Sequence, residues 1–147
     1  METYIHYGSN KFDINAFNKI ENHRLYPKPK GGLWASNVNS KYGWKEYCSE
    51  YDIDVLCDYS YSFTFNLLDN ARIINIHTVS DFNNIYKKYK RADIEKEYNL
   101  KILDYEMMAK DYDVIDFLLT NDNRLYSLMT YWDCDSILVL NPNVIVY

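Results

Sequence analysis

The sequence predicts an α+β domain built on mixed or antiparallel β-sheets, and three observations support this expectation. The chain has 147 residues, the size of one domain, so we expect a single domain over residues 1–147. Hydrophobic residues make up 48% of the chain and aromatic residues 17%, which is enough to fill a core. Strand-like alternation occurs at both ends and in the middle, without the regular strand–helix repeat of a doubly wound parallel sheet.

The first third of the chain contains the only strong loop. Residues 3–7 predict a first strand, and residues 13–20 a short helix with Asp13 as its N-cap. Residues 27–32 predict a loop, because two prolines and two glycines in six positions oppose both helix and strand. Two elements follow: a strand at 33–36 and a helix at 43–51.

The rest of the chain alternates between short strands and short helices. Residues 61–67 alternate strictly and predict a half-buried strand, joined by a tight connection at 68–70 to a second strand at 71–77. A helix capped by Thr78 or Ser80 then runs to residue 89. The remaining predicted elements are a helix at 102–110, a strand at 114–119, a turn at 121–123, a helix at 125–130, a strand at 136–140, a break at 141–143 and a strand at 144–147.

Charge and cysteine usage exclude several classes of protein. The net charge is −5; residues 1–50 hold seven Lys or Arg against five Asp or Glu, and residues 51–147 hold nine against sixteen. A wholly basic nucleic-acid binder is therefore disfavoured, whereas a local phosphate site in the first third is not. No apolar run approaches the ~20 residues of a membrane span, and no signal peptide is expected at the N-terminus. The three cysteines lack metal-ligand spacing, so we expect no metal and a reduced, cytoplasmic protein.

Two segments in the first third have residues suited to a nucleotide. His6 lies in a short strand before Gly8, where its imidazole can bond a ribose hydroxyl or simply satisfy a neighbouring backbone group. Two glycines precede the strand at 33–36, in which Trp34 and Ser36 share one face. An aromatic wall beside a hydroxyl suits a flat, amide-bearing heterocycle, and the alternative is a tight turn with a core tryptophan. The basic residues around this segment are candidates for holding a diphosphate: Arg24, Lys28, Lys30, Lys41 and Lys45.

A third segment carries two carboxylates. Asp133 and Asp135 precede the apolar strand at 136–140, and their i, i+2 spacing predicts one shared face. A carboxylate there can stabilise developing positive charge or accept a proton from a sugar hydroxyl, and the alternative is a pair of solvated turn acids. Asp116 is a rival acid, because it also precedes an apolar run.

In chain order, the three segments resemble the motifs of the ADP-ribosyltransferase family. Residues 6–9, His-Tyr-Gly-Ser, look like the family's His-Gly-Ser/Thr motif with one residue interposed. Residues 31–36, continuing through Ser40 and Lys41 to Tyr47, look like its second motif. Residues 133–135, Asp-Cys-Asp, are similar to the Glu-x-Glu that opens its last catalytic strand. The layout also resembles small phage-encoded members, some of which disable host immune proteins.

The resemblance implies a fold, a reaction and a set of residues. It implies two small β-sheets packed together with flanking helices, and transfer of ADP-ribose from NAD to a protein or nucleic-acid acceptor. For a phage-encoded toxin or counter-defence protein, the compartment would be the host cytoplasm. Asp135 would stabilise the oxocarbenium-like transition state, Asp133 would orient the acceptor, and His6 would bond the adenosine ribose. The implied NAD-binding residues are His6, Gly8, Ser9, Gly32, Trp34, Ser36 and Trp44, with Tyr42 an alternative to the two tryptophans for stacking on nicotinamide.

Two other functions are compatible with the same residues. The domain could be a non-catalytic, protein-binding inhibitor, since its sixteen tyrosines and its acidic second part suit an adhesive surface. It could also be a small ribonuclease that uses His6 and His77, although no lysine–histidine constellation stands out.

Overall fold

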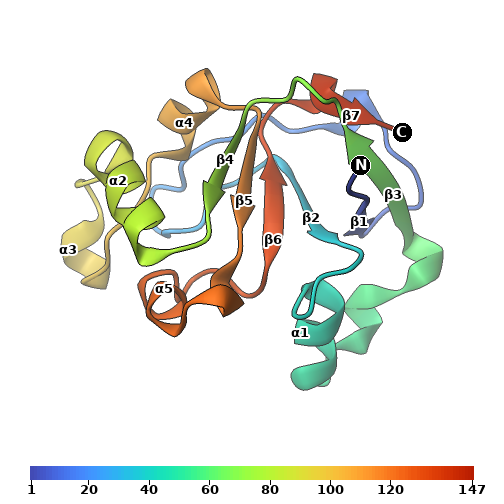
Figure 1. The fold of residues 1–147 in the computed structure, drawn as a ribbon, viewed down its shortest axis with the longest axis horizontal. Coiled ribbons are helices and arrows are strands. Elements are labelled where there is room, and N and C mark those ends of the chain that lie inside the picture. The colour runs from blue at the N-terminus through green and yellow to red at the C-terminus, as the bar shows by residue number, and fades with distance from the viewer.

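Seven strands form one curled, mixed sheet in the order β4-β5-β6-β2-β1-β3-β7 in the computed structural model, which describes residues 1–147 (Figure 1). The pairing of β4 with β5 is parallel and every other pairing is antiparallel. The α+β prediction is confirmed, whereas the expectation of two separate sheets is wrong, because β1 and β2 pair across the middle. The strands are β1 (Tyr4–Tyr7), β2 (Leu33–Asn37), β3 (Ser62–Leu67), β4 (Ile73–Ile76), β5 (Val114–Phe117), β6 (Ser136–Val139) and β7 (Ile145–Val146).

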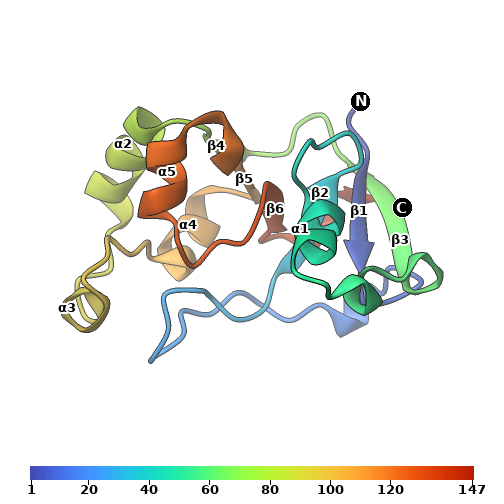
Figure 2. The ribbon, with the colours of Figure 1, turned by 90° about the horizontal axis from the view of Figure 1, so that it is seen from below.

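Five short helices surround the sheet. Side chains of α2, α4 and α5 pack on one face of β5 and β6, while α1 lies below the sheet near β2 and β1 (Figure 2). Single 3₁₀ turns complete the chain at 14–16, 54–57, 59–61, 119–121 and 142–144. The helices are α1 (Trp44–Glu50), α2 (Val79–Tyr89), α3 (Glu95–Tyr98), α4 (Tyr105–Asp111) and α5 (Asn123–Leu128).

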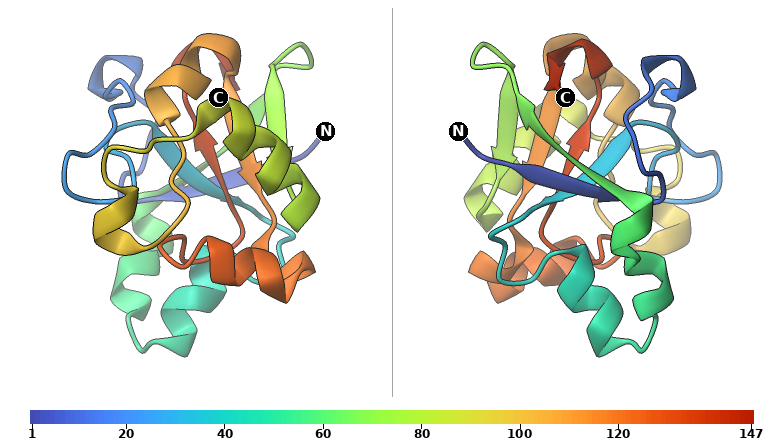
Figure 3. Two further views of the ribbon diagram at one scale, coloured as in Figure 1. Left: turned by 90° about the vertical axis from the view of Figure 1, so that its left-hand side faces the viewer. Right: turned by 90° about the vertical axis from the view of Figure 1, so that its right-hand side faces the viewer.

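Apolar side chains fill both faces of the central strands. Along β5 and β6, Ile115 and Leu138 belong to the larger core cluster with the helices, and their neighbours Val114 and Val139 belong to a smaller one. Residues of β1 and β3, including Phe65, close the smaller cluster. The curl of the sheet makes this possible, since it brings β1 and β3 over the second face (Figure 3).

Three local predictions differ from the structure. The helix expected at 13–20 is one 3₁₀ turn, Ile14–Ala16; Asp13 caps it, but the backbone is extended again at Phe17. The strands at 61–67 and 71–77 do not pair with each other: β3 pairs with β1 and β7, and β4 with β5. Helix α3 and the turns at 54–57 and 59–61 were not predicted, because they carry no apolar repeat.

Candidate functional site

A cleft of about 410 Å³ opens where β1 and β2 separate. The two strands pair only at Tyr4 with Asn37 and at Ile5 with Ser36. Beyond this pair the two strands are joined by the His6 side chain, whose Nδ1 lies 2.7 Å from the Trp34 carbonyl oxygen. Residues from all three predicted motif segments line the cleft: Ile5, His6, Tyr7, Gly8, Lys28, Trp34, Ala35, Ser36, Trp44, Leu56, Trp132, Asp133, Cys134 and Ser136.

His6 presents a hydrogen-bond acceptor to the cleft. A carbonyl oxygen only accepts, so Nδ1 of His6 must donate to Trp34, which leaves Nε2 of the neutral ring as the acceptor. Burial lowers the pKa of His6 below its ordinary 6.5, and the bond to the Trp34 carbonyl opposes that shift only in part. Gly8, at φ +118°, lies beside Nε2, and a Cβ added there would be 3.6 Å from it. The imidazole is therefore neutral at pH 7 and its edge is open to a donor such as a hydroxyl.

The Trp34 ring forms an aromatic wall of the cleft, and the ammonium group of Lys28 lies over this ring. The Trp34 ring packs against Trp132, with 4.4 Å between centroids, and Trp132 is in turn fixed in the core against Phe117. The Lys28 ammonium lies 4.9 Å from the Trp34 ring centroid and 2.9 Å from Oδ2 of Asp133. The ammonium therefore sits between a carboxylate and an indole face.

Trp44 forms a second aromatic part of the cleft. It begins α1, and its ring stacks on Tyr47 with an interplanar angle of 16°. Tyr42, the alternative stacking residue, does not line the cleft, and its hydroxyl donates to Glu50. Of the three predicted stacking residues, Trp34 and Trp44 therefore line the cleft and Tyr42 does not.

The Ser36 hydroxyl is used to hold α1 on β2. It accepts from the Trp44 backbone N–H at 2.9 Å and donates to the Asp135 carbonyl at 3.3 Å, and the residue is 3% exposed. A first-turn N–H of a helix has no partner within the helix, so this contact anchors α1. Ser36 therefore lines the cleft, but its hydroxyl is engaged in holding α1 on β2.

Two further predicted binding residues lie outside the cleft. Ser9 is partly exposed, and its hydroxyl donates to the Lys11 carbonyl. Gly32 has φ +69°, and a Cβ added to it would lie 2.6 Å from Cδ1 of Leu138. The close approach that requires glycine here is therefore to β6 and not to a ligand.

Asp135 faces away from the cleft, contrary to the expectation that it shares a face with Asp133. Its buried carboxylate accepts from the Leu119 N–H at 2.7 Å, the Thr120 N–H at 3.0 Å and the Thr120 hydroxyl at 2.6 Å. The i, i+2 argument fails because β6 begins only at Ser136, so strand alternation does not extend back to Asp133. Asp133 is the carboxylate of the cleft.

The rival acid Asp116 lies in a second cavity, of about 530 Å³, lined mostly by polar residues. Its Oδ2 lies 3.1 Å from Nε2 of His77, and burial raises its pKa against the opposing effect of that histidine. Asp135 and His77 line this cavity, and His6 does not. The structure therefore does not assemble the histidine pair of the ribonuclease hypothesis.

The cleft contains residues that were not among the predicted site residues. Trp132, Leu56 and Tyr7 line it, and Lys28, considered only as a diphosphate contact, forms the ion pair at its mouth. Trp132 could have been predicted as a cleft residue from its position next to Asp133 in the sequence. All three cysteines are free thiols, and no group of three or more His, Cys, Asp or Glu side chains is placed to hold a metal ion.

Comparisons with protein-family models, curated proteins and solved structures found no match for this chain. No helix combines the length and the apolar character needed to cross a bilayer.

Proposed function

We propose that the protein is an NAD-dependent ADP-ribosyltransferase and that the cleft between β1 and β2 binds NAD. The observation that carries the proposal is the ammonium of Lys28 between the Asp133 carboxylate and the Trp34 ring. A carboxylate beside an indole face forms a site for a cation. The nicotinamide ring of NAD is a flat cation, and it would take the place of the ammonium.

The rest of the cleft supports a nucleotide with a ribose. Nε2 of His6 is an acceptor for a ribose hydroxyl, and Gly8 allows close approach beside it. The volume of about 410 Å³ lies within the range of small-molecule sites. The topology of the sheet also supports the proposal. The three motif segments are distant in sequence and belong to β1, to β2 and to the residues just before β6. They come together because β2 pairs with both β1 and β6.

The proposed chemistry assigns the main role to Asp133. When the bond between nicotinamide and ribose breaks, nicotinamide leaves as a neutral ring and the positive charge moves to the ribose. A carboxylate beside that sugar stabilises the charge as it develops. Asp133 is 32% exposed at its side chain and has one ion-pair partner, whereas Asp135 is saturated by three donors.

The test compares nicotinamide release from NAD by the wild type, Asp133→Asn and Asp116→Asn. Loss of the charge at Asp133 is expected to slow release by ~10²–10³, the usual effect of removing one electrostatic contact to a transition state. Asp116→Asn is the matched control, because it removes an acid of the second cavity and should leave the rate within about twofold. No release by the wild type, or full activity in Asp133→Asn, would refute the proposal.

A further inference from the structure

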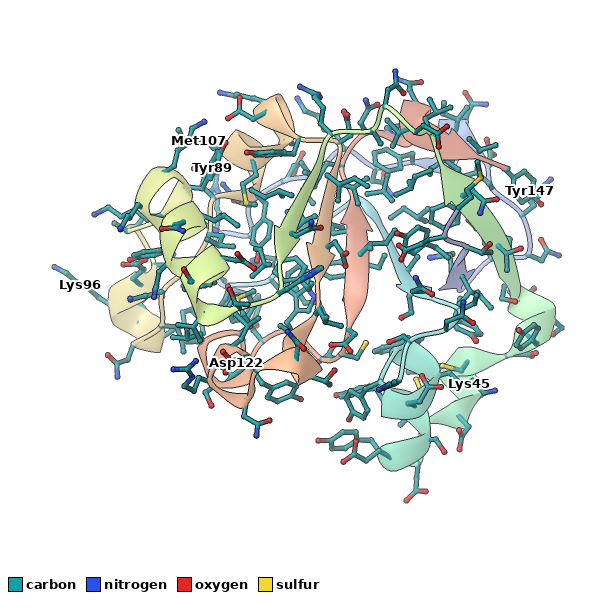
Figure 4. The ribbon with its side chains drawn as sticks, viewed as in Figure 1. Lys45, Tyr89, Lys96, Met107, Asp122 and Tyr147 are labelled. Atoms are coloured by element: carbon teal, nitrogen blue, oxygen red, sulfur yellow. The ribbon has the colours of Figure 1, made fainter.

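The segment after α1 forms an exposed lobe beside the cleft. It comprises residues 50–61 and consists of the end of α1 and two 3₁₀ turns, Asp54–Cys57 and Tyr59–Tyr61. Figure 1 shows this part of the chain below β2 and β3, and Lys45, labelled in Figure 4, marks the start of α1 next to it. The lobe extends from the sheet instead of packing on it.

The lobe exposes large apolar side chains. Val55 is 84% exposed and Tyr59 is 69% exposed. Five such residues occur within eleven positions: Tyr51, Val55, Leu56, Tyr59 and Tyr61. Single exposed apolar residues are ordinary, but a cluster of this kind is typical of an interaction surface. Tyrosine is also among the residues enriched at such surfaces.

The lobe is also acidic, and no basic side chain from this part of the sequence offsets its charge. Residues 46–71 contain no Lys, Arg or His. The exposed acids of the lobe are Glu50, Asp52, Asp54 and Asp58. Asp58 accepts from the Ser60 N–H and hydroxyl, which lowers its pKa and keeps it charged. The surface therefore joins negative charge to aromatic and aliphatic side chains.

Contacts connect the lobe to the wall of the cleft. Leu56 lines the cleft directly. The Tyr59 ring meets that of Tyr7, another cleft residue, edge-on with 6.3 Å between centroids. The Cys57 thiol lies 3.6 Å from the Trp44 carbonyl oxygen. A molecule bound on the lobe would lie next to the cleft.

We propose that the lobe docks the macromolecular acceptor and that this acceptor is a protein segment rich in Arg or Lys with apolar side chains between them. The acceptor role rests on the proposed transferase function. Guanidinium and ammonium groups pair with carboxylates and stack on tyrosine rings, and the apolar side chains between them would cover Val55 and Leu56. Nucleic acid is disfavoured, because its phosphates would meet like charge.

The test measures binding of three fluorescently labelled probes to the full chain by anisotropy. The probes are a peptide of alternating Arg and Leu, a peptide of alternating Glu and Leu, and a single-stranded oligonucleotide. We expect the Arg–Leu peptide to bind most tightly. Asp52→Asn with Asp54→Asn should weaken it about tenfold, as expected for two exposed charge pairs. Asn is suited to position 52, where φ is +56°.

The matched control removes two exposed acids outside the lobe, by Asp69→Asn with Glu97→Gln. It should change peptide affinity by less than about twofold, since distant exposed charges are screened. Equal losses in both double variants, or tighter binding of the oligonucleotide or the acidic peptide, would overturn the docking proposal.

Nicotinamide release from NAD separates this proposal from the transferase proposal. The lobe substitutions do not touch residues that line the cleft, so release should be unchanged in both double variants. Release without lobe-dependent peptide binding refutes the docking surface alone. Lobe-dependent peptide binding without release by the wild type refutes the acceptor role and favours the non-catalytic inhibitor.

Discussion

At the scale of single residues, two aspartates two positions apart illustrate how surroundings determine chemistry. Asp135 is buried and receives three hydrogen bonds from Leu119 and Thr120. Asp133 is partly exposed, and its one ion-pair partner is the side chain of Lys28. A carboxylate saturated by fixed donors holds structure together, whereas one paired with a mobile side chain can exchange that partner for a ligand.

Asp135→Asn is expected to act on stability. The Asn oxygen can still accept from the Leu119 and Thr120 N–H groups, which both bond Oδ1, but these donors lose a charged acceptor and the NH₂ group then faces the Thr120 hydroxyl, at a cost of about 1–3 kcal/mol. Urea unfolding at pH 7 should show that loss in the midpoint. The remaining folded protein should release nicotinamide faster than Asp133→Asn does. A slower rate than Asp133→Asn at wild-type stability would return the catalytic role to Asp135.

NAD binding should depend on the protonation of His6. Burial lowers its pKa below 6.5, so the neutral ring predominates at pH 7 and above, and Nε2 is an acceptor there. We expect the dissociation constant of NAD, measured by calorimetry, to be nearly constant between pH 8 and pH 7 and to rise as the pH falls through the lowered pKa. His6→Asn should remove this pH dependence; an identical profile in that variant would exclude His6 as the titrating group.

At the scale of elements, Asp113 joins three strands at one end of the sheet. It precedes β5, and its carboxylate accepts from the Arg72 backbone N–H and guanidinium before β4 and from the Asn141 amide after β6. The hydrogen bonds from the Arg72 side chain have the largest effect, and together these contacts hold the pKa of Asp113 well below its usual range. The start of β5 is therefore fixed by a charged hydrogen-bond network as well as by the backbone hydrogen bonds of the sheet.

Replacing Asp113 with Ala should cost about 1–3 kcal/mol in the free energy of unfolding at pH 7, since the Arg72 backbone N–H and the Asn141 amide, both partly buried in these bonds, lose a charged acceptor. The folded-state pKa is depressed, so this contribution is complete above about pH 5 and falls as pH drops below the ordinary aspartate value. Urea denaturation at pH 7 and pH 3 should show a smaller difference between wild type and variant at pH 3. An undiminished difference would mean that packing, and not charge, carries the effect.

Local elements were predictable, and pairings were not. Residues 61–67 alternate between apolar and polar side chains, as a strand with one buried face requires whatever its partners are, and that strand is confirmed as β3. A tight connection at 68–70 was predicted between two strands, but β4 pairs with β5, some forty residues later in the sequence, because sheet partners depend on contacts remote from the connection. The cleft could be anticipated from the order of its motifs, whereas the orientation of Asp135 depended on where β6 begins.

At the scale of the whole molecule, the two apolar clusters share their strands. Val114 and Ile115 are neighbours in β5 and face different clusters, and the same holds for Leu138 and Val139 in β6. Neither cluster can lose its packing without disturbing the strands that support the other. We therefore expect the chain to unfold as one cooperative unit.

Phe65→Ala tests this cooperativity. Phe65 is 2% exposed in the smaller cluster, and its truncation should cost about 3–5 kcal/mol. Trp132 lies in the larger cluster and Trp34 packs against it, so tryptophan fluorescence, to which Trp44 at the cleft also contributes, reports mainly on that cluster. The urea midpoints from tryptophan fluorescence and from far-UV circular dichroism should shift together. A fluorescence midpoint that stays at the wild-type value would show that the clusters unfold separately.

The ion pair at the mouth of the cleft has a consequence for ligand choice. Lys28 is a tethered competitor, present at the high effective concentration of a group on the same chain, so a ligand must displace it to reach Asp133 and Trp34. Exchange of one cation for another keeps the carboxylate paired, whereas a neutral ring would leave it without a counter-charge. Under the proposed function, the cleft therefore selects the oxidised dinucleotide, whose ring is positive, over the reduced one, whose ring is neutral.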